Sequence, residues 1–312
     1  MKNHARLAAS VVVLVAMVLL QTPVAGAPIE VALDPNKFGK LDQKDTKCGA
    51  VGCGPTAAVN SFTYLQTAFP SAYPTPLVPA GQDVAVADSL ADLMGCCGAG
   101  GTSIENFILG KRTYVESKDP GATKYGAEIS GTWNGAGKPD FVHQNATAAD
   151  LLGFIERELR AGEDVEISIA NAGVGHFLTL TGVTFEDETR QRGQLAFIDP
   201  IGGKPGTTDL RIDANGEIRT TYILGAQIAF VRHAVSESPV PEASTLAVLA
   251  AGVIVVASSR RGVRTDSGAR EAQVRTRWVG DFLRSAAARQ RCDSNRLLGA
   301  ATHRMMGVLR EW

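Results

Sequence analysis

The sequence predicts an α+β domain in which a helical part comes first and an antiparallel sheet follows. Apolar residues recur at helical spacing after Pro55, whereas apolar and polar residues alternate in stretches of residues 165–198, which is typical of strands. The chain has 312 residues, of which 45% are hydrophobic, enough for a substantial core. Because 31 Lys and Arg residues balance 32 Asp and Glu residues, we expect no nucleic acid partner.

Residues 1–27 are typical of a secretory signal peptide. Lys2 and Arg6 precede an apolar run from Leu7 to Leu20, and small residues follow at positions 24–27. At about 1.5 Å per residue the apolar run spans roughly 21 Å, which is short of the ~30 Å core of a bilayer. The pattern therefore favours an exported protein over a transmembrane anchor.

A second targeting region is predicted at residues 236–261. Ser236–Ser244 is a polar, Pro-rich linker, Leu246–Ala257 is apolar, and Arg260-Arg261 follows. This order resembles the PEP-CTERM sorting signal, with Pro241-Glu242-Ala243 in place of Pro-Glu-Pro. The resemblance implies a short transmembrane helix, insertion into the membrane, processing by an exosortase and a periplasmic or cell-surface location in a Gram-negative bacterium. A plain C-terminal anchor is the alternative.

Removing these two regions leaves residues 28–235 as one working domain of ordinary size. It has 17 basic and 25 acidic residues, a net charge of −8. The remaining residues, 262–312, form an Arg-rich tail, either disordered or an artefactual extension of the reading frame. We assign no function to this tail.

Cys53 precedes a predicted helix at residues 54–66 and is the favoured nucleophile. Pro55 suits the first turn of a helix, and Phe62 and Leu65 continue its apolar face. A cysteine at a helix N-terminus meets free N–H groups and the positive end of the helix dipole, which stabilise the thiolate. The same N–H groups can stabilise an oxyanion during acyl transfer.

The other cysteines leave further interpretations open. Cys48 is the rival nucleophile, although the two glycines between it and Cys53 make a helix behind it difficult to start. A Cys48–Cys53 disulfide is a further alternative, because an exported protein meets an oxidising compartment. Cys96 and Cys97 lie in a Gly-rich turn and suggest a structural role. No Cys-x-x-Cys spacing and no Gly-rich phosphate loop occurs, so we expect neither a metal nor a nucleotide cofactor.

His176 and Asp199 lie at the ends of two predicted strands. A helix with a capping box at Thr147–Asp150 and a terminal Gly162 precedes these strands. His176 opens one strand and Asp199 closes the next, and strands joined by a hairpin run antiparallel, so the two side chains can meet at one edge of the sheet. Asp199 would then orient the imidazole, which would take the proton of Cys53.

Three short motifs carry a family resemblance: Cys53-Gly-Pro-Thr-Ala, Gly175-His176-Phe-Leu-Thr-Leu-Thr-Gly and Phe197-Ile-Asp199-Pro200. Together they resemble the papain-like bacteriocin-processing (double-glycine leader) peptidase superfamily, over roughly residues 41–200. The resemblance implies a papain-like fold with Cys53 as nucleophile, His176 as base and Asp199 as orienting residue. It also implies an oxyanion-hole glutamine, for which Gln43 is the candidate, although Gln43 lies ten residues before Cys53 and five before Cys48.

These motifs predict an exported cysteine peptidase that forms an acyl-enzyme with peptide or protein substrates. One alternative is a catalytically inactive papain-like module that binds a surface or matrix partner. Another is a different acyl transfer, such as crosslinking of surface polymers. The redox state of Cys48 and Cys53 separates peptidase from binding module, since a disulfide between them would block the nucleophile.

Overall fold

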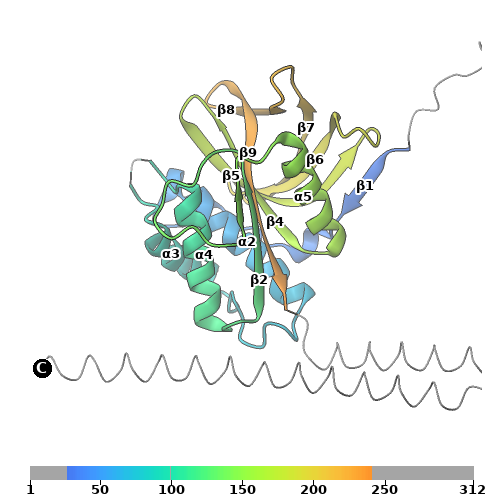
Figure 1. The fold of residues 1–312 in the computed structure, drawn as a ribbon. Helices are drawn as coiled ribbons and strands as arrows, with labels where there is room; N and C mark the ends of the chain where they lie inside the picture. Colours follow the sequence, from blue (N-terminus) through green and yellow to red (C-terminus); the bar gives the residue numbers. More distant parts are fainter. Residues whose placement is uncertain (1–26, 99, 241–312) are drawn as a thin grey trace, which may run out of the picture. The chain divides into compact units, whose positions relative to one another are not determined.

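A computed structural model describes residues 27–98 and 100–240 of the chain (Figure 1). Residues 1–26 of the predicted signal peptide, the apolar run Leu246–Ala257 and the tail 262–312 lie outside the described residues. Within the described part, no helix is long and apolar enough to cross a membrane.

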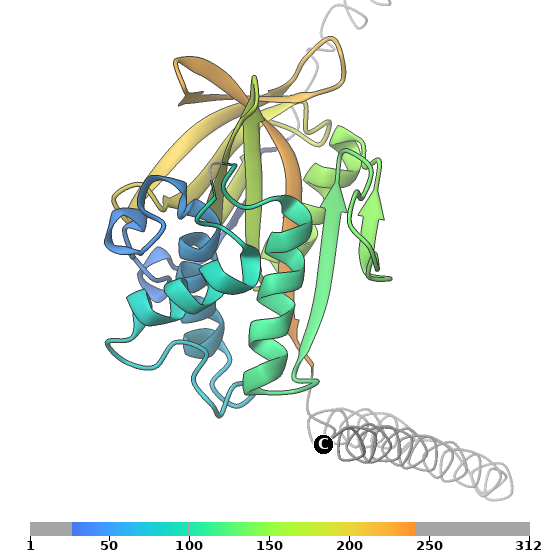
Figure 2. The ribbon, with the colours of Figure 1, turned by 90° about the vertical axis from the view of Figure 1, so that its left-hand side faces the viewer.

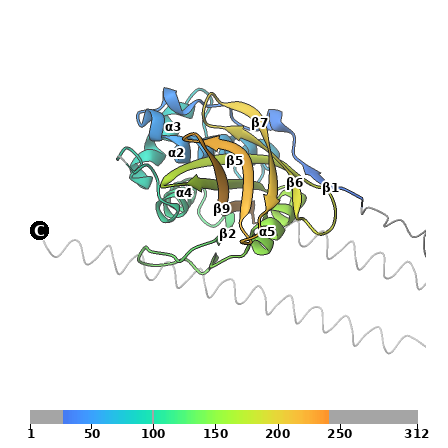
Figure 3. The ribbon, with the colours of Figure 1, turned by 90° about the horizontal axis from the view of Figure 1, so that it is seen from above.

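Three helices pack together against one side of a large sheet (Figures 1 and 3). The first, α2 (Cys53–Ala68), is buried along most of its length because the other two helices and the sheet cover it. The second and third are α3 (Asp83–Met94) and α4 (Ile104–Lys118), and α4 also runs alongside the sheet strand β2 (Thr123–Ile129), as seen in Figure 2. Three short 3-10 helices precede α2: Pro35–Lys37, Gln43–Asp45 and Gly49–Val51.

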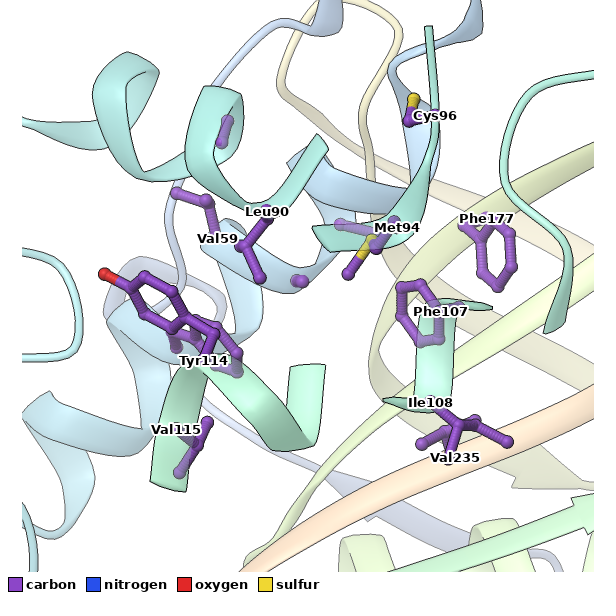
Figure 4. Packing of buried hydrophobic residues seen from close by; sticks show 14 of the residues in the cluster. Val59, Leu90, Met94, Cys96, Phe107, Ile108, Tyr114, Val115, Phe177 and Val235 are labelled. Atoms are coloured by element: carbon purple, nitrogen blue, oxygen red, sulfur yellow. The ribbon is translucent and has the colours of Figure 1, made fainter. Parts of the chain in front are cut away.

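The apolar core beneath these helices joins them to the sheet (Figure 4). Val59 of α2, Leu90 of α3 and Met94 of α3 pack in its helical half. The rings of Phe107, from α4, and Phe177, from the sheet, stack with their centroids 4.3 Å apart. Burying large aromatic and aliphatic side chains in this way is the main stabilising contribution to helix–sheet packing.

Six strands close into an antiparallel barrel. Each strand pairs with the next one along the chain, and the last strand returns to pair with the first. The closure is visible at Val165, which pairs with Leu180 on one side and Ser236 on the other. The strands are β4 (Asp164–Asn171), β5 (Val174–Phe185), β6 (Arg192–Asp199), β7 (Lys204–Ile212), β8 (Ile218–Leu224) and β9 (Gln227–Pro239).

Three further strands extend the barrel sheet. β1 (Ile29–Ala32) pairs antiparallel with β5, β2 pairs antiparallel with β9, and β3 (Val142–Gln144) pairs parallel with β2. A fourth helix, α5 (Ala148–Ala161), packs its apolar face into the same core as the barrel strands. It begins at the predicted capping box, and Gly162 ends it in the left-handed conformation.

The prediction of a papain-like α+β fold, with an N-terminal helical part and a C-terminal antiparallel sheet, is wrong. The strands close into a six-stranded barrel with extra strands, and the described part of the chain is mostly sheet with four α-helices. Individual elements lie where their periodicity predicts them, including α2 over the expected helix 54–66. Closure depends on the pairing of β4 with β9, which lie far apart in the chain, and local alternation of side chains does not encode that pairing.

The last strand also continues beyond the domain end expected at residue 235. β9 runs to Pro239 and takes in the first four residues of the predicted linker Ser236–Ser244. Ser236 and Glu237 are fully buried there. The polar sequence suggested a solvated linker, but Glu237 binds the buried ammonium of Lys111 and so joins the core.

Candidate active site

Cys53 is the first residue of α2, at the point where this helix meets the barrel wall. Gly52 permits the close turn before it, because a Cβ at position 52 would lie 2.7 Å from Thr46 Oγ1. The Thr179 hydroxyl of β5 donates to the Ala57 carbonyl at 2.9 Å and holds the first turns of α2 against the barrel. Cys53 therefore presents a buried thiol beside the free N–H groups of a helix N-terminus.

His176 and Asp199 meet at the rim of the barrel. His176 lies near the start of β5 and Asp199 is the last residue of β6, and these strands pair antiparallel. His176 Nε2 lies 2.8 Å from Asp199 Oδ1. Because Nε2 is engaged by the carboxylate, Nδ1 is the ring nitrogen left for the Cys53 thiol.

Burial and neighbouring groups set the charge state of the Cys53–His176 pair. Burial raises the pKa of the Cys53 thiol, but the hydrogen bond and charge of His176, with the N–H groups of Phe177 and Gly54, lower it below its ordinary value. Burial lowers the pKa of His176, but its hydrogen bonds to Asp199 and Cys53 raise it to about 9. Both shifts favour a thiolate beside an imidazolium, the reactive form of such a pair.

The Asp199 carboxylate is held from three directions. Besides His176, the backbone N–H of Ile201 donates to Oδ1 at 2.8 Å, and the Tyr222 hydroxyl donates to Oδ2 at 2.7 Å. Burial raises the pKa of Asp199, but its hydrogen bonds to His176, Ile201 and Tyr222 outweigh burial and hold it below the usual range. Tyr222 comes from β8 and has no motif around it in the sequence, so only the closure of the barrel brings it to the site.

The disulfide differs from the Cys48–Cys53 pairing that the sequence left open. Cys48 forms a disulfide with Cys97, which joins the segment before α2 to the turn after α3. The Cys48–Cys53 disulfide is therefore wrong, and Cys48 has no free sulfur to act as the rival nucleophile. Cys53 and Cys96 are the free cysteines of the described residues. Cys96 is buried, with its thiol 3.1 Å from the Val51 carbonyl, and burial raises its pKa.

Gln43 lies in the segment that leads into Cys53, in the 3-10 helix Gln43–Asp45. Its side-chain Nε2 donates to the Ala50 carbonyl at 2.9 Å, and its backbone N–H donates to the Pro200 carbonyl at 2.8 Å. Gln43 thus connects the turn before Cys53 to the residue after Asp199. One amide hydrogen remains for another acceptor, and its role in an oxyanion hole stays a prediction.

A second buried cluster, here the Lys111 cluster, consists of Lys111, Asp164, Glu166, Glu237 and Ser61. The Lys111 ammonium binds Glu166 at 2.5 Å and also binds Glu237, and the Ser61 hydroxyl donates to Asp164. The three carboxylates approach closely enough for a metal ion. The donor set does not fit one, because the ammonium already occupies the space between two of them and supplies their positive charge.

Fold and site together define a β-barrel protein with a cysteine at a helix N-terminus and a histidine–aspartate pair at the barrel rim. No model of a known protein family matches the chain, and no curated protein matches it significantly.

Proposed function

We propose that this protein is an exported cysteine peptidase that cleaves peptide or protein substrates through Cys53. The observation that carries the proposal is a free, buried thiol at a helix N-terminus beside His176, an imidazole whose Nε2 is held by the Asp199 carboxylate. A histidine or an Asp-Pro turn alone would be an ordinary structural feature. Their convergence on one buried thiol is what favours catalysis.

The proposed reaction begins when the Cys53 thiolate attacks the carbonyl carbon of a peptide bond. N–H groups at the start of α2 stabilise the oxyanion of the tetrahedral intermediate. The His176 imidazolium gives its proton to the leaving amine, so the C–N bond breaks and a thioester with Cys53 remains. Neutral His176 then takes a proton from water, the resulting hydroxide attacks the thioester, and the carboxylic acid and thiolate are released. Asp199 keeps the imidazole in the orientation that both steps need.

The location that we propose is the periplasm or cell surface. The Cys48–Cys97 disulfide supports it, because such bonds persist in oxidising compartments outside the cytoplasm. The predicted signal peptide and the PEP-CTERM-like region, with a membrane and an exosortase as partners, are consistent with that compartment. The same disulfide leaves Cys53 unblocked, which favours an enzyme over an inactive binding module.

Alkylation of the exported protein with its disulfide intact tests the proposal. Iodoacetamide at pH 6 should modify Cys53 at least about tenfold faster than an ordinary thiol. Peptide mapping of the alkylated protein identifies which cysteine has reacted. His176→Ala should remove that advantage, and Cys96 is the internal control because it is buried without an imidazole partner. A Cys53 no more reactive than an ordinary thiol would sink the proposal.

A peptide library then identifies the reaction. Fragments that appear with the wild type and not with Cys53→Ala support hydrolysis. Incorporation of an added primary amine in preference to water would instead select the acyl-transfer alternative.

A further inference from the structure

Tyr222 lies next to the histidine–aspartate pair, although nothing in the reaction above uses it. Its hydroxyl donates to Asp199 Oδ2 at 2.7 Å, on the oxygen that faces away from His176. Asp199 Oδ1 receives His176 Nε2 and the Ile201 N–H, both at 2.8 Å. With both oxygens occupied, the carboxylate cannot rotate about its terminal bond without breaking a hydrogen bond.

The ring of Tyr222 also covers the imidazole. The centroids of the Tyr222 and His176 rings lie 5.9 Å apart with 26° between their planes. The ring of Phe197, from β6, also packs against the Tyr222 ring in an edge-to-face arrangement, with centroids 6.0 Å apart and 63° between the planes. An aromatic ring in this position reduces the access of water to the imidazole–carboxylate bond, and a hydrogen bond shielded from water is stronger.

Tyr222 remains a hydrogen-bond donor over the working pH range. Burial, with the hydrogen bond to Asp199 and its charge, raises the pKa of the phenol above its ordinary value. The side chain therefore stays protonated at any pH at which a thiolate–imidazolium pair exists. The four ionisable groups that face one another here come from four elements: Cys53 from α2, His176 from β5, Asp199 from β6 and Tyr222 from β8.

We propose that Tyr222 is a positioning residue of the proposed peptidase, which holds Asp199 and, through it, keeps the Nδ1 of His176 directed at Cys53. The inference rests on the proposed function, because the orientation matters only if the imidazole serves the thiol. It assigns β8 a direct part in the site, so the closed barrel rather than a single hairpin supports the histidine. Positioning groups behind a catalytic residue typically change rates by tenfold to a hundredfold, since small displacements of the imidazole misalign proton transfer.

Two variants of the full chain separate the hydroxyl from the ring. Tyr222→Phe keeps the ring and removes the donor, whereas Tyr222→Leu removes both. Tyr114→Phe is the matched control, because its hydroxyl donates to the Leu77 carbonyl at 2.7 Å, within the helical part. We expect kcat for peptide cleavage to fall about tenfold in Tyr222→Phe and about a hundredfold in Tyr222→Leu, with KM little changed.

The pH dependence of Cys53 alkylation gives a readout that needs no substrate. A less well-placed imidazolium stabilises the thiolate less, so the midpoint of the alkylation profile should move upward by about one pH unit in Tyr222→Phe and stay in place in Tyr114→Phe. Thermal melting checks that each variant is folded.

The outcomes distinguish the two proposals. A reactive wild-type Cys53 with an unmoved profile and unchanged kcat in folded Tyr222→Phe overturns the role of Tyr222 alone. A wild-type Cys53 that alkylates as an ordinary thiol overturns the peptidase proposal, and the role of Tyr222 with it. A shifted profile with reduced kcat supports both.

Discussion

The Cys53 site and the Lys111 cluster are both groups of ionisable side chains at the boundary between the helices and the barrel, but they differ in depth and in the helix position that they use. Cys53 begins α2, and the Asp199 side chain behind its histidine is 17% exposed. Lys111 lies in the middle of α4, and the side chains of Lys111 and Glu166 are 0% exposed. One cluster is built at the rim, whereas the other is enclosed by two helices and two strands.

The difference in depth changes what the charges can do. At the rim, a thiol and an imidazole with shifted pKa values can exchange a proton, and a helix N-terminus offers N–H groups to a developing negative charge. In the Lys111 cluster, the ammonium is committed to the buried carboxylates of Glu166 and Glu237. A buried ion pair therefore serves the proposed reaction at the Cys53 site, whereas in the Lys111 cluster it connects a helix to two strands of the barrel.

The largest expected effect is the loss of activity on replacing the rim thiol. Cys53→Ala or His176→Ala should lower kcat/KM for peptide cleavage by at least about 10⁴-fold, because the nucleophile and its proton acceptor act as one unit. The measurement is steady-state cleavage of a substrate identified from the library. Cys96→Ser, at the other free cysteine, should retain most activity. Equal losses in Cys96→Ser and Cys53→Ala would contradict the assignment of the nucleophile.

Replacement of the buried ammonium should mainly affect stability. Lys111→Met leaves Glu166 and Glu237 close together without their cation, so the free energy of unfolding should fall by about 3–5 kcal/mol. Urea denaturation measures it. The exposed pair Lys47–Asp92 is the matched control, and Lys47→Met should cost less than about 1 kcal/mol.

Neutralising the two carboxylates that Lys111 binds provides a second control for the same cluster. Adding Glu166→Gln and Glu237→Gln to Lys111→Met removes the uncompensated carboxylates and should recover part of the lost stability. A triple variant no more stable than Lys111→Met alone would show that the ammonium acts through packing rather than charge.

The Cys48–Cys97 disulfide should contribute somewhat less to stability than Lys111. Its cysteines are 49 residues apart, so removing both by Cys48→Ala and Cys97→Ala should lower the free energy of unfolding by about 2–4 kcal/mol, since the unfolded chain gains conformational freedom. Urea denaturation again measures this. Cys53 should keep its fast alkylation in the folded double variant, and a loss of that reactivity would mean that the disulfide also shapes the site.

The Lys111 cluster should also make stability depend on pH. Burial raises the pKa of Glu166 from 4.5 to about 7, and that of Glu237 likewise, against the opposing charge of Lys111. Between pH 4.5 and about 7, these two carboxyl groups hold more protons in the folded protein than in the unfolded chain. The free energy of unfolding therefore falls as pH rises through this range. We expect Glu166→Gln to flatten this dependence by about 1 kcal/mol per pH unit. An unchanged slope would contradict the raised pKa of Glu166.

The smallest expected effect is on the pH dependence of stability at the rim. Taken alone, His176 would make the free energy of unfolding fall as pH rises from 6.5 to about 9, because the pKa of its imidazole is raised in the folded protein. Cys53 contributes to the free energy of unfolding with the opposite sign. Its pKa is lowered from 9.0 in the folded protein, so its stabilising contribution is lost as pH falls. Between pH 6.5 and 9 the folded pair holds one proton and so does the unfolded pair, so their contributions cancel.

Activity should behave differently from stability over the same range. Deprotonation of the His176 imidazolium removes the proton for the leaving amine, so kcat/KM should fall with a midpoint near pH 9. The comparison of a pH–rate profile with urea denaturation at each pH measures this contrast. Activity that stays constant to pH 10 would contradict the raised pKa of His176.

Some features of the site follow from short stretches of sequence. Pro55 and the apolar spacing behind it predict a helix over residues 54–66 with Cys53 just before it, and the structure begins α2 at Cys53 itself. The hairpin between β5 and β6 brings the start of one strand beside the end of the other, so His176 and Asp199 meet as expected. In both cases the residues that decide the structure lie within one element or two consecutive ones.

Other features have no local signal. Tyr222 reaches Asp199 because the barrel closes, the partner of Cys48 is 49 residues away, and Lys111 and Glu237 meet from α4 and β9. The papain-like fold was expected because its three motifs are local, whereas closure is a long-range pairing.

The sequence by itself determined the helices that follow Cys53 and Thr147, the three strands between Val165 and Asp199, and the polar residues at their ends, because backbone sterics and side-chain periodicity act over a few residues. Only the tertiary structure decided which of those ends face one another, which cysteines pair and which charges are buried. Those outcomes depend on how distant surfaces pack, and packing free energy belongs to the assembled core rather than to any single segment.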